Sequence, residues 1–226
     1  MDRSAWLRER RRVAEERHDT LHAATYDQQE WGAIFPTHRR FVARLIERCP
    51  PGGRILDAAC GTGKYFGMVL DAGRRVVGTD QSAGMLAQAR AKYPDVPTEK
   101  VGLQELAADG EFDAVMCVDA MENVFPEDWP LVLANLRRAL RPGGPLYLTV
   151  ELPDEHELER VFAEAVAEGL PVVAGEHTSP GGGYHYYPAP AQVAEWVRQA
   201  GLRRLEDGVG DDYYHLLAEA EPAPRR

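Results

Sequence analysis

Short apolar runs alternate with helical segments through most of the chain, and this alternation restricts the fold more than any other feature. Apolar runs bounded by turn residues predict strands, and apolar side chains at helical spacing predict the helices between them. Such alternation builds a parallel sheet with right-handed crossovers and helices on both faces. We therefore predict a doubly wound α/β fold. The expected strands cover residues 54–57, 76–80, 97–102, 112–118 and 145–151.

The last third of the chain follows a different pattern. Residues 169–190 are rich in Gly, Pro and aromatic side chains and are expected to form a loop. Two final strands, at residues 202–206 and 213–218, are joined by residues 207–212, and the last strand is expected to be antiparallel. The expected helices cover residues 4–18, 36–48, 82–93, 129–140, 154–168 and 190–200, with a further one ending near Leu70.

Charge is distributed unevenly along the sequence. The 226 residues carry a formal net charge of -10 and fit a single domain. Residues 101–226 hold 23 acidic and only 9 basic side chains. Because phosphate binding needs clustered Lys and Arg, this half argues against a nucleic-acid partner. No stretch has the pattern of a secretory signal or a membrane span, so we expect a cytoplasmic protein with no membrane partner.

The three cysteines, Cys49, Cys60 and Cys117, lack the close spacing of a metal site or a redox pair. We expect a reducing compartment, no disulfide framework and no bound metal.

A glycine-rich turn lies between the first expected strand and the helix that follows it. Gly61 and Gly63 permit close approach of the backbone to a ligand, and a helix N-terminus offers unpaired N–H groups. The spacing is not that of a GxxxxGK[ST] phosphate loop, and Phe66 stands where a GxGxxG fingerprint has its third glycine. Asp80 ends the next strand and can accept hydrogen bonds from both hydroxyls of a ribose. The turn and Asp80 together predict a nucleoside-binding site.

Four ordered motifs make the chain resemble a known family. They are ILDAACGTG at residues 55–63, GTDQSAGML at 78–86, FDAVMCV at 112–118 and LRRALRPGGPLYL at 136–148. The chain is similar to the class I S-adenosylmethionine-dependent methyltransferases of the small-molecule type, over about residues 20–151. The resemblance implies a Rossmann-like sheet and S-adenosylmethionine as cofactor.

The resemblance also implies which residues hold the cofactor. Asp57 and the backbone of the glycine turn would bind the methionine ammonium group, and Asp80 would bind the ribose. Family members often have an acid at the position of Gly102, so here Gln104, backbone or water must contact the adenine amino group. The expected cofactor-binding residues are Tyr26, Asp57, Ala58, Gly61, Gly63, Asp80, Gln81, Met85, Leu103, Gln104 and Cys117.

The resemblance divides the single domain into four parts. These are N-terminal cap helices (residues 1–50), the cofactor-binding core (51–151), a substrate lid inserted after the fifth strand (152–190), and a C-terminal helix with the last two strands (191–226). Residues 181–183 are three glycines, which we expect to be the hinge of the lid. Limited proteolysis there should then change when cofactor binds.

Substrate residues are expected where the fourth and fifth strands end and in the aromatic loop, because ligands bind at the carboxyl edge of such sheets. Imidazole titrates near neutrality, so His185 is the first candidate for a general base and His177 the second. Glu122 is a third catalytic candidate. For the histidines the alternative is a hydrogen-bonded role in a packed lid, and for Glu122 it is a polar cap at the start of a helix. The expected substrate-binding residues are Trp31, Asn123, Glu151, Tyr184, Tyr186 and Tyr213.

The preferred hypothesis is in-line methyl transfer to an oxygen or nitrogen of a small molecule of specialised metabolism. Tyrosines near Glu122, Glu151 and residues 211–212 slightly favour an amine, because aromatic faces and carboxylates attract ammonium groups. One alternative is an enzyme of the same fold that uses the cofactor for cyclisation or rearrangement without methylation. Another is a non-catalytic cofactor-binding partner protein. We expect a monomer or a homodimer.

Overall fold

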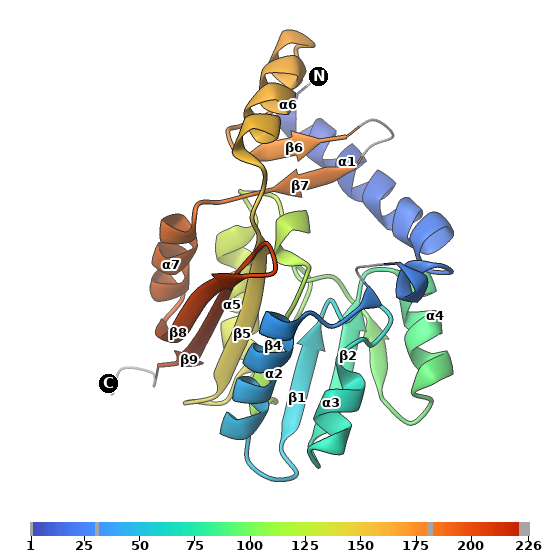
Figure 1. The fold of residues 1–226 in the computed structure, drawn as a ribbon, viewed down its shortest axis with the longest axis vertical. Helices are drawn as coiled ribbons and strands as arrows, with labels where there is room; N and C mark the ends of the chain where they lie inside the picture. Colours follow the sequence, from blue (N-terminus) through green and yellow to red (C-terminus); the bar gives the residue numbers. More distant parts are fainter. Residues whose placement is uncertain (1, 30–31, 180–182, 222–226) are drawn as a thin grey trace.

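A seven-stranded sheet forms the centre of the molecule, in the order β3-β2-β1-β4-β5-β9-β8 (Figure 1). The computed structural model describes residues 2–29, 32–179 and 183–221. Strands β1 to β5 run parallel, β9 is antiparallel to β5, and β8 is antiparallel to β9. The predicted fold is confirmed. The strands are β1 (Arg54–Ala58), β2 (Arg75–Asp80), β3 (Thr98–Lys100), β4 (Ala114–Cys117), β5 (Pro145–Glu151), β8 (Leu202–Gly210) and β9 (Tyr213–Ala220).

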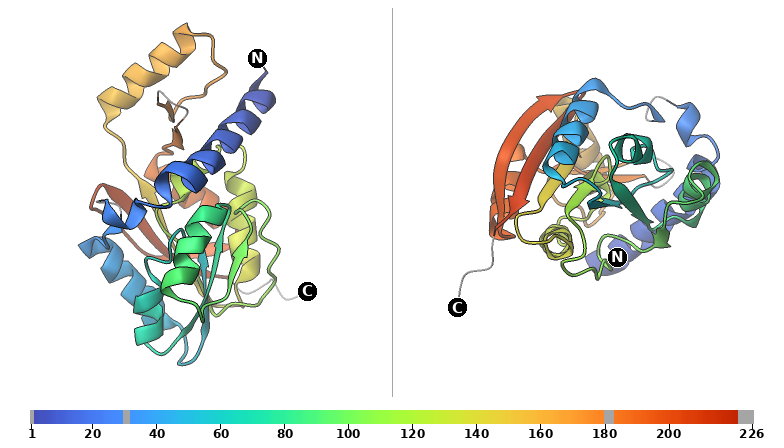
Figure 2. Two further views of the ribbon diagram at one scale, coloured as in Figure 1. Left: turned by 90° about the vertical axis from the view of Figure 1, so that its right-hand side faces the viewer. Right: turned by 90° about the horizontal axis from the view of Figure 1, so that it is seen from below.

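Helices cover both faces of this sheet (Figure 2). Phe41 of α2, Phe66 of α3 and Leu86 of α4 join one apolar cluster, whereas Trp129 of α5 and Val193 of α7 join another. The helices are α1 (Arg3–Arg17), α2 (Pro36–Arg48), α3 (Phe66–Asp71), α4 (Ala83–Lys92), α5 (Trp129–Ala139), α6 (Glu155–Ala167) and α7 (Pro190–Gln199), with the short helical turns η1 (His18–His22), η2 (Tyr26–Gln28) and η4 (Met121–Asn123).

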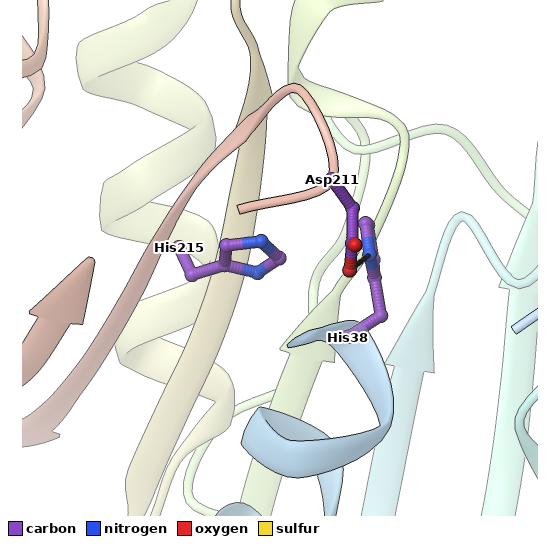
Figure 3. Close-up of side chains that lie close together, drawn as sticks. All are labelled: His38, Asp211 and His215. Carbon is purple, nitrogen blue, oxygen red and sulfur yellow. Dashed lines mark ion pairs between the residues drawn. The ribbon is translucent and has the colours of Figure 1, made fainter. Parts of the chain in front are cut away.

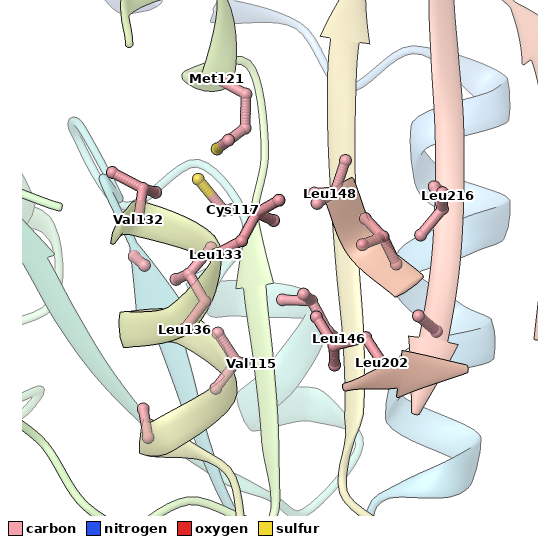
Figure 4. Close-up of a cluster of buried hydrophobic side chains, with 14 of the residues drawn as sticks. Val115, Cys117, Met121, Val132, Leu133, Leu136, Leu146, Leu148, Leu202 and Leu216 are labelled. Atoms are coloured by element: carbon pink, nitrogen blue, oxygen red, sulfur yellow. The ribbon is translucent and has the colours of Figure 1, made fainter. Parts of the chain in front are cut away.

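Strand β4 shows how the sheet separates these two clusters. Val115 and Cys117 pack toward α5, as Figure 4 shows, whereas Ala114 and Met116 belong to the cluster on the opposite face. All four side chains are fully buried. A strand that is covered on both faces has a continuous apolar run in its sequence, because neither set of alternate side chains is exposed to water. The sequence pattern that predicts the fold therefore has a direct cause in the packing.

Helices α1 and α6 and a small separate sheet stand beyond the carboxyl ends of the parallel strands (Figure 1). The small sheet pairs β6 (Glu176–Thr178) with β7 (Tyr184–Tyr186) in antiparallel register. The prediction of a loop throughout residues 169–190 is therefore wrong for these two strands. Aromatic side chains such as Tyr184 and Tyr186 favour extended backbone, but the surrounding Gly and Pro residues conceal this preference in the sequence.

The C-terminal hairpin is longer than predicted. Strand β8 continues to Gly210, so the connection is a tight turn and not the expected loop over residues 207–212. Asp211 and Asp212 both have positive φ angles, of 54° and 61°, as a two-residue hairpin turn of type I′ requires. The carbonyl oxygen of Asp212 accepts from the amide of Leu152 at 2.8 Å. The tip of the hairpin thus lies beside the carboxyl end of β5.

We expect Leu133→Ala to lower the free energy of unfolding by about 2–5 kcal/mol, because it leaves a cavity in the core beside β4. Leu133 is fully buried, whereas Leu131 on the same helix is 48% exposed. Leu131→Ala should change stability by no more than about 0.5 kcal/mol. Urea denaturation of both variants measures the difference. Equal losses would contradict the assigned packing of α5.

Candidate active site

The glycine-rich turn after β1 holds the carboxylate of Asp80. Asp80 Oδ2 accepts from the amide of Gly61 and Oδ1 from the amide of Ser82, each at 2.8 Å. Gly61 has φ +53° and Gly63 has φ +76°, backbone conformations that side chains disfavour. A Cβ at Gly63 would also lie 2.8 Å from the Phe66 ring. Asp80 is thereby fixed with lone pairs still available to a ligand.

Asp57 lies beneath the same turn, at the end of β1, and is 1% exposed. Its Oδ2 has no hydrogen-bond partner in the described part of the chain. Burial, and then the negative charge of Asp80, raise the pKa of Asp57 well above its usual value. A buried carboxylate oxygen without a partner is costly. A cationic ligand group in the pocket would satisfy this atom.

A pocket, here called the first pocket, opens above Asp57 and Asp80 and is bordered by Tyr26, Lys64 and Asp119. The expected cofactor-binding residues fall into two groups, those that line this pocket and those that do not. Ala58, Gly63 and Cys117 do not line the pocket; Ala58 and Cys117 are fully buried in the sheet beneath it. Those that line it are Tyr26, Asp57, Gly61, Asp80, Gln81, Met85, Leu103 and Gln104.

The N-terminal segment covers this pocket. Asp19 accepts from the Ser82 hydroxyl at 2.5 Å and from the Gly84 amide at 3.0 Å, at the start of α4. Asp27 accepts from Thr62 in the glycine turn at 2.5 Å. A carboxylate at a helix N-terminus is electrostatically favourable. These contacts bring the segment across the pocket, and Tyr26 lines it.

Helix α1 contributes pocket residues that the sequence analysis missed. Arg10, Arg11 and Ala14 line the first pocket, as does His18 at the start of η1. Arg11 forms an ion pair with Glu105, 2.6 Å away in the loop after β3. In the sequence these residues belong to an ordinary charged helix. Nothing in their spacing shows that the helix folds back over the sheet.

Asp119, directly after β4, is the centre of a charged cluster that the sequence analysis did not select. Its Oδ1 lies 2.7 Å from His38 Nε2, and its Oδ2 lies 2.6 Å from Lys64 Nζ and 3.3 Å from the Tyr65 hydroxyl. Burial alone would raise the pKa of Asp119, but the hydrogen bond from His38 and the charge of Lys64 outweigh it. They lower this pKa to about 2. Asp119 is therefore a permanent carboxylate.

A second pocket adjoins the first, on the side of the β6–β7 sheet. It contains all three expected catalytic residues, His185, His177 and Glu122. It also contains four of the expected substrate residues, Asn123, Glu151, Tyr184 and Tyr213. Tyr186 does not line either pocket and packs in the apolar cluster around Trp6 and Tyr184. Trp31 and residues 181–182 of the expected hinge lie outside the described residues; Gly183 borders the second pocket.

Two groups in the second pocket have unusual titration behaviour. Burial, and then the charge of Glu151, raise the pKa of Glu122 well above its usual value, and Glu122 Oε2 has no partner among the described residues. Burial lowers the pKa of His185 to about 4, so its imidazole is neutral at pH 7. His185 Nδ1 lies 2.7 Å from the Tyr187 hydroxyl, which donates to Glu151 at 3.4 Å. The acids of the turn, Asp211 and Asp212, which were expected in this pocket, do not line it.

The two pockets share a wall. Tyr26, Asp119, Asn123 and Tyr184 are among the residues that line both. A ligand in the first pocket and a ligand in the second can therefore meet at this wall. Such proximity is what a transfer reaction between two bound molecules requires.

Comparisons with known proteins agree with this geometry. Residues 55–144 match the family model described as a methyltransferase domain. A ubiquinone biosynthesis O-methyltransferase of Xanthomonas axonopodis pv. citri (strain 306) is 32% identical over 193 residues, covering 81% of this chain and 75% of the relative. The chain belongs to the class I S-adenosylmethionine-dependent methyltransferases. A demethylmenaquinone methyltransferase of Renibacterium salmoninarum is 31% identical over 185 residues, covering 76% of this chain and 77% of the relative.

Solved structures show the same fold. The 1,6-didemethyltoxoflavin-N1-methyltransferase of Burkholderia thailandensis superposes with a TM-score of 0.69 at 18% identity, covering 94% of this chain and 90% of that one. The magnesium protoporphyrin IX methyltransferase of Synechocystis PCC 6803, with bound S-adenosylhomocysteine, gives a TM-score of 0.68 at 18% identity and covers 93% and 98%.

The methyltransferase uses S-adenosylmethionine, and the first pocket fits this molecule. Asp57 has a buried oxygen suited to the methionine ammonium group, and Asp80 has oriented lone pairs suited to the ribose hydroxyls. When bound, S-adenosylmethionine supplies a methyl group activated by positive sulfur. Among the described residues, no helix has both the length and the apolarity needed to cross a bilayer.

We expect S-adenosylmethionine binding to release a proton from Asp57. In the unliganded protein this carboxyl is protonated below its raised pKa, and pairing with an ammonium group lowers that pKa. Titration calorimetry in two buffers of different ionisation enthalpy, repeated over a series of pH values, measures the release. Asp57→Asn should abolish it, whereas Glu99→Gln on β3 should not. Release that persists in Asp57→Asn would exclude Asp57 as its source.

We expect Asp80→Asn to weaken S-adenosylmethionine binding by about 10- to 100-fold, the equivalent of one hydrogen bond to a charged group. The amide retains one acceptor oxygen and loses the second. The same titration with Glu99→Gln provides the control, because Glu99 is exposed and lines neither pocket. Unchanged affinity of Asp80→Asn for S-adenosylmethionine would show that Asp80 does not bind the ribose.

Proposed function

We propose that this methyltransferase transfers the methyl group to an oxygen or nitrogen of a small molecule bound in the second pocket. The observation that carries the proposal is the wall shared by the two pockets at Tyr26, Asp119, Asn123 and Tyr184. The new bond forms between the acceptor atom and the methyl carbon as the bond from that carbon to sulfur breaks. The protein mainly aligns the two molecules and excludes water.

The covering elements support the exclusion of water. Arg3 of α1 donates to Glu176 of β6 at 2.8 Å, and Glu176 is fully buried. Trp6 packs edge to face against Tyr184, which in turn packs against Phe125. Helix α1 and the β6–β7 sheet are thus joined by charged and aromatic contacts above both pockets. This supports our proposal that residues 152–190, together with α1, form the substrate lid.

His185 is the best-placed group to accept a proton from the acceptor atom. Tyr187 donates to Glu151, so its hydroxyl oxygen is available to accept from His185 Nδ1–H. That tautomer leaves Nε2 with a lone pair, and the low pKa of His185 keeps the ring neutral. Glu151 and Tyr187 then act as positioning residues for this base. His177 lines the same pocket and remains the second candidate.

The lining of the second pocket supports an amine-bearing substrate. Glu122 is buried with one oxygen unpartnered, Glu151 is nearby, and Tyr187 and Tyr213 add aromatic faces. An ammonium group would satisfy Glu122 and restore its charge. The names of the relatives support a hydroxyl as the methylated group, since one is an O-methyltransferase of ubiquinone biosynthesis. A phenol that also carries an amine combines both features.

We expect His185→Asn to reduce methyl transfer by about 100-fold or more, the usual contribution of a general base. The assay follows methyl-labelled S-adenosylmethionine into product with tyramine as acceptor. His156→Asn, on the exposed side of α6, is the matched control and should retain activity. Unchanged activity in His185→Asn would exclude His185 as the base. Conversion of acceptor without consumption of the methyl donor would instead favour the non-methylating alternative.

We expect tyramine to bind more tightly than 4-hydroxyphenylacetate, by about tenfold or more, which corresponds to about 1.4 kcal/mol. The two probes share a phenol and a chain length and differ in the sign of their charge. Glu122→Gln should remove most of this preference, because it removes the carboxylate that pairs with the ammonium group. Calorimetry with S-adenosylhomocysteine present measures both ligands. Equal binding by the wild-type enzyme would contradict the amine assignment.

A further inference from the structure

Two histidines and an aspartate converge on one point outside both pockets. His38 lies in the first turn of α2, Asp211 in the turn between β8 and β9, and His215 on β9 (Figure 3). Both imidazoles are fully buried, whereas the Asp211 side chain is 21% exposed. The three side chains point toward one another from elements that are far apart in the sequence.

Their separations suit a metal ion. One potential ligand atom from each residue lies within 4.8 Å of the others. His38 Nδ1 and Asp211 Oδ2 are 3.8 Å apart. Two ligand atoms at about 2.1 Å from a tetrahedral zinc ion are separated by about 3.4 Å. A contraction of a few tenths of an ångström would therefore bring these two atoms into coordination.

The hydrogen bonding of His38 leaves a buried lone pair. Its Nε2 lies 2.7 Å from Asp119 Oδ1, and a carboxylate only accepts, so Nε2 carries the proton. Its Nδ1 is buried and has no hydrogen-bond partner in the described part of the chain. In the neutral ring this nitrogen presents its lone pair to Asp211. The two acceptors face each other, and a positive charge between them would stabilise both.

His215 can adopt the tautomer that a metal requires. Its Nε2 lies 2.9 Å from the carbonyl oxygen of Gly210, and its Nδ1 lies 2.8 Å from the Tyr147 hydroxyl. Because a carbonyl only accepts, Nε2 now carries the proton. The Tyr147 hydroxyl both donates and accepts. The proton can therefore move to Nδ1, where Tyr147 accepts it, and Nε2 then exchanges its hydrogen bond to Gly210 for the metal.

A second proton on His38 is the other way to supply positive charge. A hydrogen bond from Nδ1 to Asp211 would need a separation of about 2.7–3.2 Å, which is a larger contraction from 3.8 Å than zinc coordination needs. The pairing of His38 with Asp119 is also the carboxylate–histidine arrangement that usually lies behind a metal ligand. Two imidazoles and one carboxylate suit zinc, whereas calcium and magnesium prefer oxygen ligands.

We propose that His38, Asp211 and His215 bind one zinc ion. The ion joins the hairpin turn to the start of α2, where Asp211 already accepts from the Thr37 amide at 2.7 Å. Through His38 it also fixes the carboxylate of Asp119, which borders both pockets. The role is structural, with a positioning effect on the active site. It departs from the expectation of no metal, which rested on sequence spacing alone.

Titration of the chelator-treated, full-length protein with Co²⁺ and Zn²⁺ tests the site. We expect one equivalent of Co²⁺ to produce visible absorption, Zn²⁺ to displace it, and Zn²⁺ to raise Tm. His38→Gln and Asp211→Asn should each weaken zinc binding by at least about 100-fold, beyond the loss typical of an outer-shell partner. His156→Gln, on the exposed side of α6, is the control and should bind zinc as the wild type does.

Far-UV circular dichroism of each variant shows whether it is folded, and Asp211→Asn is the milder change because its side chain is partly exposed. The proposal is overturned if no one-to-one complex forms with Co²⁺. It is also overturned if folded His38→Gln and Asp211→Asn proteins bind zinc as tightly as the wild type, since the binding would then be at other sites.

Discussion

A group of carboxyl side chains buried at the carboxyl edge of the sheet is the constraint on which the rest of the site depends. Asp57, Asp80, Asp119 and Glu122 all lie there in largely buried positions. Removing a charge from water is costly unless hydrogen bonds or an opposite charge replace the lost hydration. Backbone amides satisfy Asp80, and Lys64 with its neighbours satisfies Asp119. Asp57 and Glu122 each retain an unpartnered oxygen.

We propose that the two unpartnered acids bind the two ligands of the enzyme. Asp57 lies in the first pocket and suits the cationic methionine portion of S-adenosylmethionine, whereas Glu122 lies in the second pocket and suits an ammonium group on the acceptor molecule. Each buried acid reduces the stability of the protein while it lacks a partner, and the interaction with a bound cation offsets this loss. The uneven acidity of the sequence thus has a local counterpart in the substrate side of the fold.

Sequence reasoning succeeded where local pattern determines position. Asp57 and Asp80 end adjacent parallel strands, so the alternation of strands and helices places both at one edge of the sheet. Asp119 also follows a strand, yet its importance depends on His38, 81 residues earlier in the chain. Arg10 lines the pocket because α1 folds back over the sheet. Neither the pairing of Asp119 with His38 nor the position of Arg10 can be recognised from a local sequence pattern, because both depend on how distant elements pack.

A crystal structure of the enzyme with S-adenosylhomocysteine and tyramine would test the central claim most directly. We predict that the amino group of the nucleoside ligand lies on Asp57, its ribose on Asp80, and its sulfur at the wall shared by the two pockets. Tyramine should occupy the second pocket, with an acceptor atom facing that sulfur. A nucleoside bound elsewhere, or a sulfur directed away from the shared wall, would contradict the account.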